Sequence, residues 1–297
     1  MKEEFALKKG KALIIGASGM AGQAFTKELL MNGYHPLGLS RGGPDIFMDA
    51  TKEDKHLQEH ILRLRPGLII NCAAIVSHLE CEKNPKQAYA VNTHIPEIIA
   101  ECTAKCGSKF IQISTDHYYS GDKDSLHSED HPLTILNYYA ETKREGELNA
   151  LKNPESLIIR TNITGIRGDI SRQTFAEWLI DCIEKRKHMN LFTDFYTSTL
   201  DTSNFAKIVL NQQILDSYGV MNIASSTVSN KKAFAISLAK RLGFDLDWSQ
   251  DASVKSLNIP RAESLGLDCT RAESIIGSAM PDLSNVCHSI ALQRAQS

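Results

Sequence analysis

The chain has 297 residues, a hydrophobic content of 42%, a charged content of 23% and a formal net charge of −2. These values are typical of a globular protein, and the small negative charge without a basic cluster argues against broad nucleic-acid binding. No apolar run is long enough to cross a bilayer, and the polar start lacks a signal-peptide core, so we expect a cytoplasmic protein without a membrane partner.

The first half of the chain alternates short apolar runs with longer helical patterns, which predicts βαβ units and a parallel sheet. Helices are expected over 20–32, 51–65, 85–106 and 137–151. The expected strands cover 12–15, 35–40, 68–74, 110–114 and 157–160. The polar stretch 115–136 is long for a connection, as is typical of an active-site loop.

The pattern becomes less regular beyond residue 161. We expect helices over 173–187, 202–216, 231–242 and 271–276, an irregular aromatic segment over 190–201, and a late strand of the main sheet over 219–223. The predicted domains are a dinucleotide-binding unit, 1–160 with about 202–224, and a substrate-binding lobe, 161–201 with 225–297. The fold class is therefore α/β, a Rossmann-like doubly wound parallel sheet with a smaller C-terminal lobe.

Seven cysteines and ten histidines are scattered along the chain. No Cys-x-x-Cys pair stands with histidines at zinc spacing, and the odd cysteine count does not indicate a disulfide framework. We therefore expect a reducing compartment and no metal site.

A glycine-rich turn, Gly16-Ala-Ser-Gly19-Met-Ala-Gly22, follows the first predicted strand. A strand, a tight turn and a helix N-terminus together present backbone N–H groups to a pyrophosphate. The alternative is an ordinary strand-to-helix turn of an α/β protein. Ser40-Arg41 ends the second strand, where an acidic residue would bind a free ribose 2′-hydroxyl. A guanidinium there favours NADP(H) over NAD(H), unless Arg41 is only a solvated loop charge.

Tyr139 and Lys143 lie one helical turn apart in Tyr-Ala-Glu-Thr-Lys, so both side chains share a face. An ammonium near a phenol lowers its pKa from about 10, which suits a general acid serving a carbonyl oxygen. The spacing alone is weak evidence because it also occurs by chance. Thr115 follows the strand 110–114, and its hydroxyl could donate to the same oxygen or only cap the strand end.

Jointly these motifs resemble the extended short-chain dehydrogenase/reductases, and within them the dTDP-4-dehydrorhamnose reductase family. The matching segments occur in the family's order. They are the glycine turn, Asn71-Cys-Ala-Ala74, Ser114-Thr-Asp116, Tyr139-Ala-Glu-Thr-Lys143 and Arg160-Thr161. The resemblance covers nearly the whole chain.

The resemblance implies roles for individual residues. Tyr139 would be the catalytic acid, Lys143 would hold the nicotinamide ribose, and Thr115 would be the hydroxyl partner. The implied cofactor-binding set is Gly16, Ser18, Gly19, Met20, Ala21, Gly22, Arg41, Asp49, Ala50, Ala73, Ala74, Ile75, Tyr139 and Lys143. The candidate substrate-binding set is Thr115, Asp116, His117, Asn162, Asp194, Tyr196 and Arg261.

Two departures from the family's pattern bear on the substrate. His117 stands where the family has a tyrosine, and Asn162 leads into Ile163 where the family soon has a tryptophan that touches the sugar. We expect reduction of a 4-keto group on a nucleotide-linked deoxysugar, with the sugar, the nucleotide and the stereochemistry left open. The alternatives are an epimerase with retained cofactor and a non-catalytic nucleotide-binding regulatory subunit. By analogy with the superfamily, the helices 85–106 and 137–151 could pair in a homodimer.

Overall fold

A seven-stranded parallel sheet forms the centre of the computed structural model, which describes residues 10–41, 45–47, 49 and 54–296. Its strand order is β12-β7-β5-β4-β1-β2-β3. The strands are β1 (Lys11–Ile15), β2 (His35–Ser40), β3 (Ile46–Phe47), β4 (Leu68–Asn71), β5 (Lys109–Ile113), β7 (Leu157–Arg160) and β12 (Gly219–Asn222). The order reverses between β1 and β4, and ligands of doubly wound sheets bind at such a switch point. The predicted fold class is confirmed.

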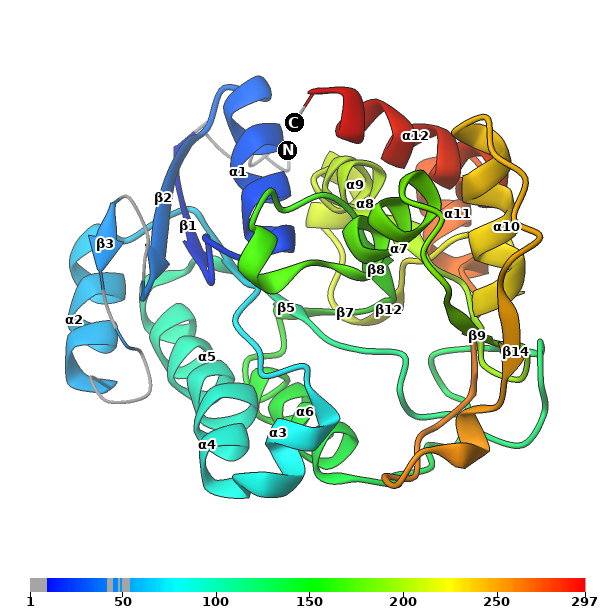
Figure 1. The fold of residues 1–297 in the computed structure, drawn as a ribbon. Coiled ribbons are helices and arrows are strands. Elements are labelled where there is room, and N and C mark those ends of the chain that lie inside the picture. The colour runs from blue at the N-terminus through cyan, green and yellow to red at the C-terminus, as the bar shows by residue number, and fades with distance from the viewer. Residues whose placement is uncertain (1–9, 42–44, 48, 50–53, 297) are drawn as a thin grey trace.

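Helices cover both faces of this sheet (Figure 1). Alternate residues of β1 face opposite layers, because side chains alternate along a strand. Ala12 and Ile14 share a hydrophobic core with α1 (Met20–Met31) and α8 (Thr202–Val209), where the Phe25 and Phe205 rings lie 5.6 Å apart. Leu13 packs in a second core with α2 (Asp54–Leu64) and α5 (Ile95–Cys106). The buried strands thus place their carboxyl ends rigidly at one edge.

The expected helix 85–106 is interrupted by a π-helical turn. α4 (Pro85–Tyr89) continues into the π turn Ala90–His94 and then into α5. Pro96 has no N–H to donate to the Asn92 carbonyl, four residues earlier, so a regular α-helix cannot pass through it undisturbed. That carbonyl lies against Gly146 of α6 (Tyr138–Ala150), where a Cβ would overlap the oxygen.

The remainder of the chain consists of short strands and helices. A four-stranded sheet has the order β13 (Ser229–Asn230), β10 (Tyr196–Thr197), β15 (Ser264–Leu267), β6 (Leu126–His127). Two further pairs join β11 (Leu200–Asp201) to β8 (Ile163–Thr164) and β14 (Gln250–Ala252) to β9 (Asn190–Phe192). The helices are α3 (His78–Lys83), α7 (Phe175–Glu184), α9 (Gln212–Leu215), α10 (Lys231–Arg241), α11 (Thr270–Ile276) and α12 (Leu283–Gln296), with 3-10 turns at Ile170–Arg172 and Val254–Ser256.

Several predicted elements differ from the structure. The helix expected over 202–216 is two helices, because Asn211 caps α9 with its side chain. The segment 190–201, expected to be irregular, holds three short strands, and α3, β15 and α12 were not predicted. The late strand 219–223 is confirmed as β12, paired with β7. Among the described residues, no helix has the length and apolar character needed to span a membrane.

Candidate active site

The glycine turn lies at the switch point between β1 and β4. Gly16 has φ +82°, and a Cβ there would come within 2.7 Å of the Ala73 nitrogen. Gly22 leaves no room for a Cβ beside the Gly16 carbonyl and Ala17. Gly19 is the N-cap of α1 and makes no side-chain capping bond. The first N–H groups of α1 are therefore available to an anion, as the helix dipole also favours. The predicted residues Ser18, Met20 and Ala21 lie in the same turn and first helical positions.

The segment after β4 is fastened by amide side chains. The Ala73 nitrogen donates to Asn71 Oδ1 at 3.1 Å, and the Ile75 nitrogen donates to Asn92 Oδ1 at 2.9 Å. Asn92 Nδ2 donates in turn to the Ile75 carbonyl and to Thr142 Oγ1, each at 3.1 Å. Asn92, from the π turn, therefore ties the segment 73–75 to α6. Sequence analysis missed this residue, although a proline four residues later was a signal.

The outer end of the turn carries the residues expected beside the adenine. Arg41 is exposed and directly follows β2. The end of β2 lies beside the glycine turn, because the Gly16 nitrogen donates to the Leu39 carbonyl at 2.8 Å. Asp49 is partly buried just beyond β3. Ala50 lies outside the described residues.

Thr115, Tyr139 and Lys143 come together between β5 and α6. All three are buried, and the Thr115 hydroxyl is close enough to the Tyr139 phenol to favour its ionised form. Lys143 Nζ donates to the Ile113 carbonyl at 2.7 Å. One helical turn sets the Tyr139–Lys143 spacing, and the end of β5 supplies Thr115, so the predicted catalytic group is assembled.

The electrostatics differ from the expectation for this pair. Burial raises the pKa of Tyr139, and the nearby Asp116 charge adds to the increase. The prediction that Lys143 lowers the Tyr139 pKa is wrong for this structure, because desolvation of the phenolate dominates. Burial also lowers the Lys143 pKa to about 8. At neutral pH Tyr139 is a neutral phenol, which is the form that donates a proton.

A buried ion-pair network lies beside the catalytic group and links α6 to the ends of β5 and β7. Arg160, at the end of β7, donates to both carboxylate oxygens of Glu147, from Nε at 3.1 Å and from Nη2 at 2.9 Å. Ser114 Oγ donates to the same carboxylate at 2.6 Å, and Arg144 Nη1 does so at 2.8 Å. Burial alone would raise the Glu147 pKa, but the bonds and charge of Arg160 lower it. The network holds α6 against the ends of β5 and β7.

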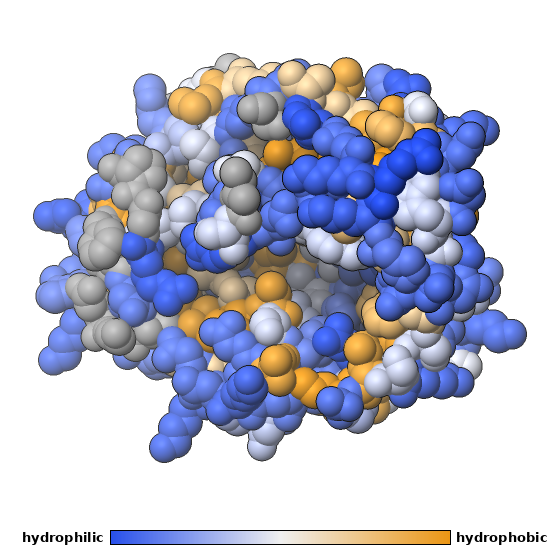
Figure 2. Space-filling model, in the orientation of Figure 1, coloured by the Kyte–Doolittle hydropathy of each residue, from blue (hydrophilic) through white to orange (hydrophobic). Residues whose placement is uncertain are grey.

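A cavity of about 420 Å³ opens beside this group. It is lined by Val76, His78, His117, Asn162, Phe175, Trp178, Asn190, Leu191, Phe192, Phe195, Lys231 and Arg261. The molecule is hollowed near the centre of the face shown in Figure 2. Among the described residues, the lining contains Lys231 and Arg261 but no carboxylate. A cavity of this composition suits an anionic ligand with an aromatic portion.

Two histidines stand between the cavity and Tyr139. The His78 ring centroid is 4.8 Å from that of Tyr139 and 4.8 Å from that of His117. His78 Nε2 and His117 Nδ1 are buried without a hydrogen-bond partner in the structure. Burial and the Arg261 charge lower the His78 pKa to about 4, and burial likewise lowers the His117 pKa. Both rings are neutral at neutral pH, with polar atoms left for a ligand.

The remaining predicted substrate residues divide into two groups. His117, Asn162 and Arg261 line the cavity. Asp116 lies behind it, where its carboxylate accepts from Asn162 Nδ2 at 2.9 Å and burial raises its pKa to about 7. Asp194 is not part of the lining, because its carboxylate accepts from Ser253 Oγ and from the Val254 nitrogen.

Tyr196 is likewise not a lining residue. It belongs to β10, and its nitrogen donates to the Glu263 carbonyl at 2.8 Å. The structure brings in residues that were not predicted, among them His78, Phe175, Trp178 and Lys231. Lys231 begins α10, and its ammonium lies 4.7 Å from the Phe175 ring centroid. No local pattern marks such a lysine, since its place in the site depends on the fold.

A second cavity, of about 700 Å³, lies beside α12. Its lining includes Met280, Asp282 and His288, and the His288 ring is hydrogen-bonded to Arg241. The smaller cavity is lined by His78 and His117 instead, and their ring centroids lie 4.8 Å and 5.5 Å from that of Tyr139. We therefore assign the candidate active site to the smaller cavity, which adjoins the acid–base group.

Known proteins resemble this chain over most of its length. The model of the RmlD substrate binding domain matches residues 10–288. A probable low-salt glycan biosynthesis reductase of Haloferax volcanii is 27% identical over 286 residues, 92% of this chain and 94% of that protein. The methionine adenosyltransferase 2 subunit beta of Bos taurus is 27% identical over 297 residues, 95% and 87% respectively.

The structural likeness extends over the whole fold. The crystal structure of dTDP-4-dehydrorhamnose reductase from Bacillus anthracis, in complex with NADP, superposes with a TM-score of 0.84 at 20% identity. The match covers 95% of this chain and 98% of that one. At this identity the likeness shows the shared fold.

Proposed function

The chain belongs to the RmlD substrate binding domain family, and from that premise we propose that it reduces a 4-keto group on a nucleotide-linked deoxysugar with NADPH. The observation that carries the proposal is the position of Tyr139 and Thr115 between the glycine turn and the cation-lined cavity. We also propose the predicted division, with 1–160 and about 202–224 binding the dinucleotide and the other residues binding substrate.

The residues present fit a dinucleotide. Gly16 and Gly22 provide the close backbone approach, and the α1 N-terminus offers uncapped N–H groups to the pyrophosphate. Arg41 stands where it could pair with a 2′-phosphate, which favours NADPH, with NADH as the alternative. When bound, the nicotinamide supplies the hydride.

The chain's own residues supply the proton and the orientation. Tyr139 donates its phenolic proton to the oxygen of the reacting carbonyl, and the neighbouring Thr115 hydroxyl orients that oxygen. Lys143 is predominantly cationic at neutral pH, since its pKa is about 8, and can hold ribose hydroxyls while its Nζ stays on the Ile113 carbonyl. The Lys143 charge then also favours the phenolate that remains after proton transfer.

The cavity suits the rest of a nucleotide-linked sugar. Arg261 and Lys231 can pair with a diphosphate, and the Phe175 and Trp178 rings offer a face for a base. His78 and His117 keep unpartnered ring nitrogens near Tyr139, where they can bind sugar hydroxyls. Because the family's sugar-contacting tryptophan is missing after Asn162, and His117 replaces a tyrosine, we propose a sugar other than the rhamnose precursor.

The test is an assay of the purified chain with NADPH or NADH and a panel of nucleotide-linked 4-keto-6-deoxysugars, alongside Tyr139→Phe. We expect one panel member to be reduced, with kcat falling about 10²- to 10⁴-fold in Tyr139→Phe and NADPH affinity unchanged. Tyr138→Phe is the matched control, because Tyr138 is the exposed neighbour on the same helix.

The likeness to the methionine adenosyltransferase subunit beta motivates a second candidate, a non-catalytic nucleotide-binding subunit. NADPH that binds without being consumed by any panel member would favour this role over the reductase. An epimerase would instead retain its cofactor on purification and rearrange a sugar without net oxidation or reduction. Turnover that Tyr139→Phe leaves intact would contradict the proposed mechanism directly.

A further inference from the structure

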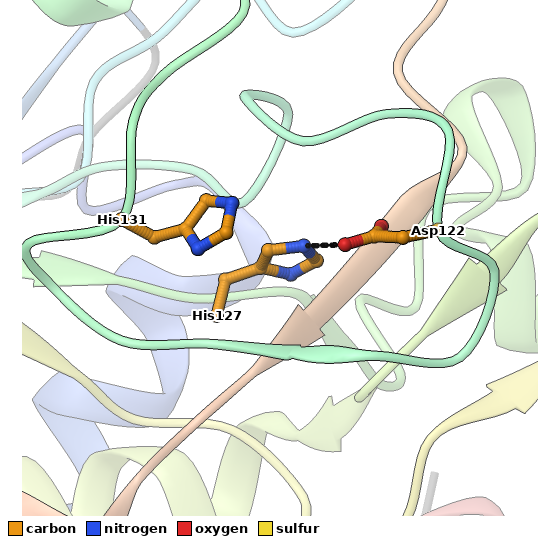
Figure 3. A group of neighbouring side chains, drawn as sticks. All are labelled: Asp122, His127 and His131. Atoms are coloured by element: carbon orange, nitrogen blue, oxygen red, sulfur yellow. Dashed lines mark hydrogen bonds and ion pairs between the residues drawn. The ribbon is translucent and has the colours of Figure 1, made fainter.

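The loop between β5 and α6 holds a second polar cluster that the proposed reaction does not use. Asp122, His127 and His131 each offer one ligand atom, and these three atoms lie within 4.8 Å of one another. Figure 3 shows Asp122 and His131 on either side of the His127 ring. It is the one group of three such side chains at this spacing within the described parts of the chain.

His127 is held in a fixed orientation. Its side chain is buried, and its ring stacks on Tyr119 with centroids 4.2 Å apart and an interplanar angle of 3°. Its Nδ1 lies 2.7 Å from the Gly266 carbonyl oxygen, which can only accept a hydrogen bond. The Nδ1 atom therefore carries a proton, and in a neutral ring the Nε2 atom presents a lone pair.

That lone pair faces a carboxylate. His127 Nε2 is 3.0 Å from Asp122 Oδ2, so two acceptors meet unless a cation stands between them. A second proton on His127 would satisfy this pair alone. The His131 ring adds a third donor atom, with its centroid 4.6 Å from that of His127 and nearly perpendicular to it. A proton is shared by two atoms, whereas a metal ion binds three or more, so three converging ligand atoms favour a metal ion.

We propose that Asp122, His127 and His131 bind a divalent zinc ion or a similar borderline transition metal. Two imidazoles and one carboxylate, with a water in the fourth position, are a ligand set that zinc accepts. The Gly266 carbonyl is the outer partner that metal-bound histidines usually have on the other ring nitrogen. Bonds of about 2.0–2.2 Å require the ligand atoms to lie closer together than 4.8 Å, and the exposed His131 side chain can make that adjustment.

The metal would be structural. β6 carries His127 and pairs with β15, and the Asp122 nitrogen donates to Ser264 Oγ at 3.1 Å, so the cluster joins the long loop to the four-stranded sheet. Tyr119, which stacks on His127, accepts from Arg160 Nη1 at 3.1 Å. An ion here therefore stiffens the loop that begins at the catalytic Thr115.

The experiment is a zinc titration of the chelator-stripped full chain against a chromogenic competitor, with cobalt(II) absorption as the spectroscopic signature. We expect one ion per chain and a midpoint of thermal unfolding raised by about 5 °C at saturation. Asp122→Asn and His131→Gln, both at exposed positions, should each weaken binding at least about tenfold.

His94→Gln is the matched control, because the His94 ring contacts Glu97 through Nδ1 and Asp54 through Nε2, so the two carboxylates meet different ring nitrogens. It should bind zinc as the parent does. Absence of zinc binding at micromolar concentrations would overturn the proposal and leave a protonated His127–Asp122 pair. Binding that survives either Asp122→Asn or His131→Gln would overturn it too, by assigning the ion to other residues.

Discussion

The sheet and the wall of the cavity are built in different ways. The central strands pair in register over two to five residues, and each functional turn follows directly from a strand end. The cavity is instead lined by residues from Val76 to Arg261, supplied by short strands, loops and helix starts. The glycine turn is thus encoded in one local segment, whereas the cavity exists only after distant segments have assembled.

The largest expected effect tests how much the stability of the central sheet depends on the buried Arg160–Glu147 ion pair. Glu147→Gln leaves the buried Arg160 without its counter-charge and should lower the free energy of unfolding by about 3–5 kcal/mol in urea denaturation. Asp194→Asn is the counterpart outside the central sheet, where a half-buried carboxylate accepts from the Val254 nitrogen of a 3-10 turn, and should cost only about 1 kcal/mol. Equal losses for the two variants would break the comparison.

Gly22→Ala tests the local encoding of the cofactor turn. The added Cβ would overlap the Gly16 carbonyl and come within 2.6 Å of Ala17 Cα. We expect a loss of about 1–3 kcal/mol in stability together with weaker NADPH binding, measured by fluorescence titration. Leu30→Ala, at an exposed position of the same helix, should change neither quantity appreciably. Normal NADPH affinity in Gly22→Ala would show that the turn tolerates a side chain.

Acid titration tests the histidines of the cavity. The folded-state pKa of His78 is lowered to about 4, so between pH 6.5 and 4 the unfolded chain holds a proton that the folded chain does not. Stability should therefore fall as the pH is lowered through this window, by at most about 1.4 kcal/mol per pH unit. His78→Gln should reduce this slope, whereas His35→Gln, at an exposed position on β2, should not. An unchanged slope in His78→Gln would contradict the assignment.

The smallest expected effect tests whether the cavity and the glycine turn bind their proposed ligands independently. Arg261 lines the cavity, and its Nε atom has no hydrogen-bond partner in the structure. Arg261→Gln should raise KM for the nucleotide sugar about tenfold, as expected for one charge-assisted contact, while NADPH affinity stays unchanged. Lys240→Gln, an exposed charge on α10, is the control. A weaker NADPH affinity in Arg261→Gln would mean that the two sites are not independent.

These contrasts explain what the sequence could predict. The strands β2 and β7 have the predicted bounds, and the glycine turn lies where it was expected, because alternation and glycine are local signals. The direction of the Tyr139 pKa shift was predicted wrongly, because the one-turn spacing reveals the nearby Lys143 but not the burial of the Tyr139 side chain. Lys231 and His78 carry no local sign of their role, and Asp194 was proposed for the cavity although it caps a neighbouring turn.

The π turn Ala90–His94 also constrains how the gene for this chain can change length. A π turn holds one residue more than an α-helical turn, so losing one residue between Pro85 and Ile95 would convert it into a regular α-helical turn. Asn92 would then leave both Ile75 and Thr142. Single-residue deletions, harmless in most surface loops, should therefore be rare in this family segment unless a compensating insertion lies within the same turn.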